Sequence, residues 1–207
     1  MPKNPRYLDE NAFKALLRAC RQRNSRNATR DRMLFQLLGR TGLRISEALA
    51  LTPQKIYLNA DPPFLRVCTL KKRKPVTDEV YLDRPLVAAL KRYIRSTLPG
   101  LLGSQVWPDS PLFPSRFRTV MVLPMTRRNA LALFRYYARR AQLPAGVTLH
   151  SLRHFRGTYL YSRTRDLEFT REQLRHSDLK ITQGYLHQSP EVLKGYLSRL
   201  SERRGKK

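Results

Sequence analysis

Gly42-Leu43-Arg44-Ile45-Ser46-Glu47-Ala48-Leu49 sets a single arginine in an otherwise apolar helical pattern. The pattern continues to residue 51, where Thr52-Pro53 stops it, so residues 45–51 predict a short helix. Arg44 is therefore expected at the junction between this helix and the one before it. Taken alone, this stretch is also typical of a surface Arg44 paired with Glu47. A functional interpretation of Arg44 therefore depends on the rest of the chain.

Two amphipathic helices are predicted before this stretch. Residues 8–17 carry apolar side chains at helical spacing after Asp9, a residue type that caps helix starts. The next segment repeats the spacing at Met33, Leu34, Leu37 and Leu38. Gly39 and Gly42 are expected to interrupt this second helix.

A small sheet and further helices are predicted after it. Residues 64–70 and 79–82 are rich in β-branched and aromatic types and indicate a hairpin, with the basic run 71–75 as its tip. Prolines between residues 99 and 124 predict a long loop. Helical patterns cover residues 85–97, 126–142, 148–162, 170–176 and 181–200, with a break near Pro190. The expected fold class is α+β, mainly α-helical with a small antiparallel sheet.

Composition predicts a polyanionic partner. The chain has 207 residues, 41 Lys and Arg against 15 Asp and Glu, and a net charge of +26. Arginines outnumber lysines, and the planar guanidinium grips phosphate with two hydrogen bonds. Nucleic acid is therefore the first hypothesis, ahead of an anionic membrane surface. The length suggests one domain over residues 1–200, followed by a basic, frayed tail over 201–207.

Other features place the protein in the cytoplasm. The first residues do not form a signal peptide, and no run is apolar for long enough to span a membrane. Cys20 and Cys68 are far apart and outside any metal-binding spacing, so both are expected to be buried small residues in a reducing compartment.

The run His150-Ser151-Leu152-Arg153-His154 is the second place where chemistry gathers. Spacing of three residues puts His150 and Arg153 on one helix face, where a phosphate would meet a proton-transfer group and a guanidinium together. A capping cluster at a helix start is an ordinary alternative. A zinc pair of His150 and His154 is disfavoured, because no Glu follows His150 and no Cys lies near. We predict neither a metal nor a cofactor.

Three more segments complete the set. They are Leu174-Arg175-His176-Ser177-Asp178, Thr182-Gln183-Gly184-Tyr185-Leu186-His187, and the hairpin tip Lys71-Lys72-Arg73-Lys74. Each has an ordinary interpretation, since a tyrosine is usually a core or surface residue and a charged hairpin tip is usually solvated.

Taken in order, these segments resemble the catalytic domain of the tyrosine recombinases, the phage-integrase family. The order Arg, hairpin Lys, His-x-x-Arg, His, Tyr is that of the family, and residues 42–49 are similar to its first arginine motif almost letter for letter. The spacings from His150 to His176 and on to Tyr185 resemble those of the Xer-type members. The resemblance covers roughly residues 7–190. Few residues precede Arg44, and in this the chain resembles catalytic-domain-only members such as the Fim-type invertases. The resemblance therefore implies no separate N-terminal core-binding domain.

The resemblance implies a role for each member of the set. Tyr185 would be the nucleophile, and Arg44 and Arg153 would clamp the scissile phosphate. His150 and His176 would complete the pocket, and Lys71 would protonate the leaving oxygen. Lys72 and Lys74 remain open as the hairpin lysine. Glu47 would hold structure near Arg44, and His187 is taken as structural.

One departure from the family pattern stands at Arg175, where the family usually has Gly before its histidine. The departure leaves open whether Arg175 alters the local turn or adds a contact to phosphate.

The implied function is site-specific DNA recombination through a 3′-phosphotyrosyl intermediate, giving integration, excision, inversion or resolution. The implied partners are double-stranded DNA, further copies of the chain as a tetramer on paired sites, and an accessory DNA-binding protein, with a nucleoid-associated location and no membrane. A type IB topoisomerase-like relaxing enzyme and a nonenzymatic nucleic-acid-binding protein are the alternatives. A metal nuclease is disfavoured, because Asp166-Leu167-Glu168 is the one close acidic pair in the latter half and lies outside the set.

Overall fold

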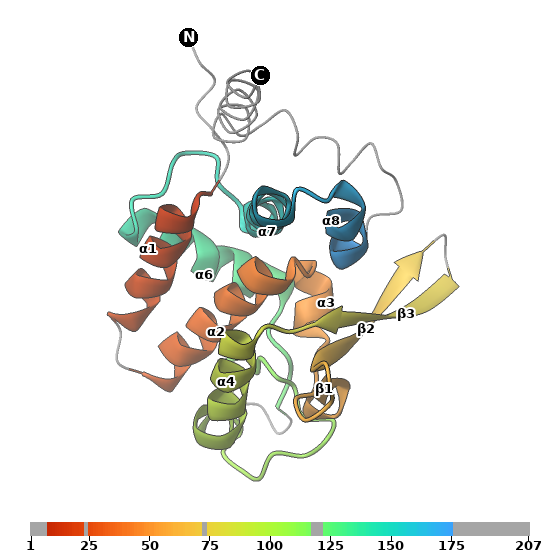
Figure 1. Cartoon of the computed structure of the whole chain (residues 1–207). Helices are drawn as coiled ribbons and strands as arrows, with labels where there is room; N and C mark the ends of the chain where they lie inside the picture. Colours follow the sequence, from red (N-terminus) through yellow and green to blue (C-terminus); the bar gives the residue numbers. More distant parts are fainter. Residues whose placement is uncertain (1–7, 23–24, 72–73, 117–121, 176–207) are drawn as a thin grey trace, which may run out of the picture.

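The computed structural model describes residues 8–22, 25–71, 74–116 and 122–175 (Figure 1). The first helices are α1 (Glu10–Arg21), α2 (Arg26–Thr41) and α3 (Ile45–Leu49), and a 3-10 turn, η1 (Pro53–Lys55), leads to the strands β1 (Ile56–Tyr57), β2 (Phe64–Lys71) and β3 (Lys74–Tyr81). Then follow α4 (Arg84–Arg92), η2 (Tyr93–Thr97), α5 (Leu98–Leu102), α6 (Arg127–Arg140), α7 (Leu149–Thr164) and α8 (Leu167–Leu174). The predicted fold class is confirmed. The helix expected over 181–200 and the basic end 201–207 lie outside the described residues.

Helix α2 is the centre of the helical layer. It contacts α1, α4 and α7, and most of its residues are buried. Its start is capped by Ser25, whose hydroxyl accepts from the Ala28 amide, as the Asp9 carboxylate accepts from the Ala12 amide at the start of α1. Within the described part of the chain, no helix is long and apolar enough to cross a bilayer.

The two glycines near the end of α2 do different things. Gly42 ends the helix as a left-handed cap with φ of 72°. The predicted interruption at Gly39 is wrong, because this residue lies inside α2. A Cβ there would come within 2.4 Å of Cε2 of Phe13, so Gly39 is a point of close approach for α1.

The sheet has the order β1-β2-β3 and is antiparallel. The predicted hairpin is confirmed, but its strands run further into the basic segment, and Lys71 pairs with Lys74 at the end of the ladder. The short β1, which the sequence did not indicate, adds Tyr57 beside Phe64, with their ring centroids 4.5 Å apart in a stacked arrangement.

Two further predictions need correction. Cys20 is buried as expected, but Cys68 is exposed. Successive residues of a strand face opposite sides, so the burial of Val67 turns Cys68 outward. The helical region after α4 also runs on through η2 and α5, past Pro99. Pro99 sits in the first turn of α5, where a missing N–H costs nothing.

A polar cluster lies inside the core, between α2 and α6. The guanidinium of Arg30 donates to the Asp31 carboxylate at 2.7 Å and to the carbonyl of Pro114, also at 2.7 Å. Asp31 accepts a further hydrogen bond from the Tyr137 hydroxyl at 3.2 Å. The Arg30 and Asp31 side chains are almost completely buried, so the cluster satisfies two charges that would otherwise be very costly in the core.

Candidate functional site

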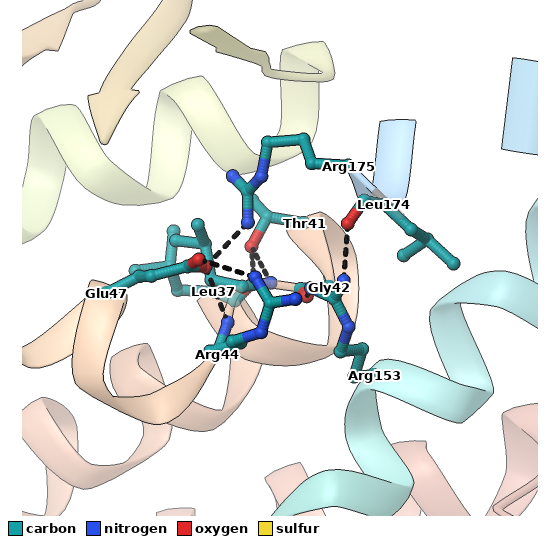
Figure 2. Close-up of polar contacts among 9 residues, drawn as sticks. Leu37, Thr41, Gly42, Arg44, Glu47, Arg153, Leu174 and Arg175 are labelled. Carbon is teal, nitrogen blue, oxygen red and sulfur yellow. Dashed lines mark hydrogen bonds and ion pairs between the residues drawn. The ribbon is translucent and has the colours of Figure 1, made fainter. Parts of the chain in front are cut away.

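Arg44 stands at the start of α3, as the sequence predicts. The left-handed turn at Gly42 ends α2, and Arg44 is the N-cap of the next helix. Its backbone N–H donates to Oε2 of Glu47 at 2.8 Å, and its Nη1 donates to Oε1 of the same carboxylate at 3.0 Å (Figure 2). The Glu47 side chain is buried while that of Arg44 is 45% exposed. Arg44 is thus anchored on one side and open to solvent on the other.

Arg153 lies deeper and joins three helices. It projects from α7 and is buried. Its Nη1 donates to the carbonyl of Gly42 at 2.5 Å, and its Nη2 donates to the carbonyl of Leu174 (Figure 2). These two carbonyls are at the ends of α2 and α8. A single guanidinium therefore fixes the position of the Arg44 junction against the segment that leads to His176.

His150 lies one turn before Arg153 on α7 and is partly exposed. Partial burial lowers the pKa of His150 below its usual value, and the positive charges of Arg153 and Arg44 lower it further. Arg44 and Arg153 are therefore close enough to His150 to affect its charge. The fold brings together three of the predicted residues, which come from two parts of the chain more than a hundred residues apart.

We expect the pKa of His150 to rise toward its usual value in an Arg44→Met variant, because one of the positive charges that disfavour the imidazolium is removed. The measurement is a pH titration of the histidine ring resonances by NMR, with a His150→Gln variant to assign the signal. Lys14→Met, which removes a charge on α1 from a pair with Glu10, is the control and should leave the pKa in place. An unchanged His150 pKa in Arg44→Met would contradict the geometry of the site.

His154 lies against His150 on α7. The two rings pack edge to face with centroids 4.6 Å apart. Burial is the main cause that lowers the pKa of His154, and the neighbouring His150 and Arg153 lower it further. Within the described ranges, no group of three or more His, Cys, Asp or Glu side chains is arranged to hold a metal ion.

Arg175 is the residue whose role the sequence left in question. It follows α8 in the left-handed conformation, with φ of 55°, which explains why a glycine would suit this position. Its side chain is buried, and Nη2 donates to Oε2 of Glu47 at 2.5 Å. Glu47 holds Arg44, as predicted, but it also holds Arg175. The sequence shows the unusual residue but carries no signal for its partner, which lies 128 residues away.

The remaining predicted residues are less fully placed. The backbone of Lys71 ends β2, opposite Lys74, at the far end of the hairpin. His176 and Tyr185 lie outside the described residues, as do Lys72 and His187. The chain reaches His176 directly from Arg175, and α8 and the hairpin lie on the same side of the molecule in Figure 1.

Comparison with known families identifies the family of this chain. A family model described as the phage integrase family matches residues 6–191, which is most of the chain. The chain belongs to the phage integrase family. The match begins before α1 and contains every residue of the predicted set.

Curated relatives of this phage integrase family member are tyrosine recombinases named XerD. The protein of Pseudomonas aeruginosa is 31% identical over 88% of this chain and 57% of its own length. That of Ralstonia nicotianae is 32% identical over 93% of this chain and 59% of its own length. The chain thus spans a little more than half the length of these relatives.

Solved structures share the fold of this family member. The site-specific recombinase XerH, in a post-cleavage complex with its palindromic difH substrate, superposes with a TM-score of 0.75 at 22% identity, covering 95% of this chain and 53% of that chain. The XerA recombinase gives a TM-score of 0.74 at 23% identity, covering 96% of this chain and 65% of that chain.

Proposed function

We propose that this chain is a site-specific DNA recombinase that cleaves and rejoins DNA strands through a 3′-phosphotyrosyl intermediate. The observation that carries the proposal is the convergence of Arg44, Arg153 and His150 on the junction between α2 and α3. Composition alone would suit any nucleic-acid-binding protein equally well. It would not require two arginines and a histidine to meet in the order that this family shares.

The arginines would stabilise the charge that builds on the scissile phosphate. When an oxygen attacks a phosphodiester, negative charge grows on the non-bridging oxygens, and fixed cationic donors oppose it directly. Arg44 is held by Glu47 with its outer side exposed, so it is suited to contact a phosphate at the surface. Arg153, anchored on two backbone carbonyls, would keep the floor of this pocket in place.

Tyr185 would be the nucleophile. A phenol with a pKa of about 10 is ionised only to about one part in a thousand at pH 7, which corresponds to roughly 4 kcal/mol of activation. Nearby guanidinium charge favours the phenolate, and a neutral imidazole at His150 or His176 can accept the proton. The lowered pKa of His150 favours the neutral imidazole.

Lys71 would act on the other side of the phosphorus. The phenolate oxygen forms a bond to phosphorus as the bond to the 5′-oxygen breaks, and that oxygen takes a proton from the Lys71 ammonium. Because the leaving alkoxide is a much stronger base than the phenolate, general-acid help matters most there. A 5′-hydroxyl from another strand can reverse the step, which exchanges strands with no external energy source.

The proposed partners follow from this chemistry. They are double-stranded DNA, further copies of the chain as a tetramer on paired sites, and an accessory DNA-binding protein. With these partners, the chain would be located at the nucleoid in the cytoplasm. The net charge of +26 supports a large phosphate-binding surface. If six to ten phosphates are engaged, DNA affinity should fall on the order of 10³- to 10⁵-fold between 50 and 200 mM salt.

Covalent trapping tests the proposed function. The protein is incubated in EDTA with nicked duplexes from DNA that flanks its own gene, and SDS-resistant adducts are compared for wild type and Tyr185→Phe. We expect an adduct with wild type and none with Tyr185→Phe, because phenylalanine lacks the attacking oxygen. Tyr196→Phe is the matched control and should form the adduct.

Three other outcomes would count against the proposal. An adduct in Tyr185→Phe would show that Tyr185 is the wrong nucleophile. Bound DNA with no adduct in any protein would favour a binding module. Relaxation of supercoiled plasmid without exchange between two duplexes would favour the topoisomerase alternative.

A further inference from the structure

Arg175 and Arg44 share one carboxylate, that of Glu47. Oε1 of Glu47 accepts from Nη1 of Arg44, and Oε2 accepts from Nη2 of Arg175 and from the Arg44 backbone N–H (Figure 2). The Glu47 and Arg175 side chains are 2% and 6% exposed, whereas that of Arg44 is 45% exposed. The inner ion pair is therefore Glu47 with Arg175, and Arg44 is the outer member.

The order of burial determines which arginine Glu47 neutralises more effectively. An ion pair withdrawn from water interacts much more strongly than one exposed to it. Burial lowers the pKa of Arg175, and the negative charges of Glu47 and Asp78 oppose that change. With Arg175 present, the carboxylate is compensated from inside, so it offsets less of the positive charge of Arg44. With a glycine at 175, the same carboxylate would face Arg44 alone.

Two features show that Arg175 is held at some cost. Its backbone is left-handed, a conformation that residues other than glycine rarely adopt. Its Nε and Nη1 are buried without a hydrogen-bond partner among the described residues. Arg175 directly precedes His176 in the sequence. Because an arginine is kept there despite these costs, we infer that its positive charge has a role.

We propose that Arg175 is a positioning residue that compensates the negative charge of Glu47 and thereby strengthens the electrostatic attraction between the Arg44 guanidinium and a bound phosphate. This inference rests on the proposed function, since it assumes that Arg44 faces a phosphate. It adds a residue that acts through Glu47 and Arg44 without touching the reacting atoms.

The test measures how tightly the folded full chain binds inorganic phosphate. Binding is monitored by the NMR resonance of the His150 ring as phosphate is added. We expect Arg175→Met to raise the half-saturating phosphate concentration about 10-fold, the effect of losing one nearby charge at a partly exposed site. Arg175→Lys should stay within about 3-fold of wild type, because it keeps the charge. Arg171→Met, which removes an equal charge from α8 that is paired with Glu168, is the control and should also match wild type.

The double variant Glu47→Gln with Arg175→Met separates charge from structure. It removes one negative and one positive charge, so the charge around Arg44 equals that of wild type, while the introduced amide oxygen can still accept from the Arg44 backbone. We expect its phosphate binding to return to within about 3-fold of wild type. A purely structural role for Arg175 predicts that the double variant binds as weakly as Arg175→Met, and that result overturns the inference.

The outcomes for this inference and for the proposed function are distinguishable. If wild type responds to phosphate and Arg175→Met responds equally, the role of Arg175 is wrong and the recombinase proposal is unaffected. If wild type does not respond, the inference fails whatever the trapping experiment shows. Circular dichroism of each variant confirms that it is folded, and Arg175→Lys with the double variant decides the matter if Arg175→Met does not fold.

Discussion

Replacing Arg153 by alanine is expected to lower the rate of adduct formation about 1,000-fold, the upper range for the loss of one preorganised donor to a developing oxyanion. Arg153 is buried and joins the carbonyls of Gly42 and Leu174. Its loss removes the proposed phosphate contact and also releases the Arg44 junction from the end of α8. The measurement is single-turnover cleavage of a duplex that traps wild type.

The variant should also be less stable, by about 1–3 kcal/mol, because two buried carbonyls lose their donor. Urea unfolding measures this loss, and the cleavage assay is run where both proteins are folded. Arg153→Lys should recover little of the rate, since an ammonium cannot span the two carbonyls as a guanidinium does. The control is Arg163→Ala, on the same helix and mostly exposed, which should cleave at the wild-type rate. Cleavage by folded Arg153→Ala at that rate would rule out a catalytic role for Arg153.

Replacing Asp31 by alanine is expected to cost about 3–5 kcal/mol of unfolding free energy, the usual effect of leaving one member of a buried ion pair without its partner. Arg30 would keep its bond to the Pro114 carbonyl and lose the carboxylate. Tyr137 would lose the acceptor of its hydroxyl as well. Equilibrium urea unfolding followed by circular dichroism measures the change.

Asp83→Ala is the matched control for Asp31. Asp83 pairs with Arg40 at 2.8 Å, but both side chains are about one-third exposed. This pair should contribute about 1 kcal/mol or less, to which the loss of the α4 helix cap adds about another 1 kcal/mol. If Asp31→Ala costs no more than Asp83→Ala, the buried cluster does not stabilise the core as the structure indicates.

The sequence was informative where local pattern determines structure. The cap at Asp9, the short helix after Arg44 and the hairpin all follow from residue type and spacing, and the structure confirms them. The proximity of Arg44 to His150 could be expected only through the family resemblance. Nothing in the local spacing of either segment indicates that they meet.

The contacts that the sequence could not show are the long-range polar ones. The carbonyl partners of Arg153 are 111 and 21 residues away, and backbone carbonyls leave no mark on a sequence. Arg30 and Asp31 were missed because hydrophobic periodicity assigns charged residues to the surface. The prediction for Cys68 was wrong for a related reason, since it rested on residue type and ignored strand alternation.

The geometry around Gly42 also limits how this protein can evolve. A Cβ at this position would lie 2.5 Å from Cδ2 of Leu174, and φ of 72° disfavours any other residue. A mutation here would disturb the carbonyl that Arg153 binds and the end of α8 together. Under the proposed function, changes in DNA target preference are therefore expected elsewhere on the surface, while position 42 stays glycine in any library selected for strand cleavage.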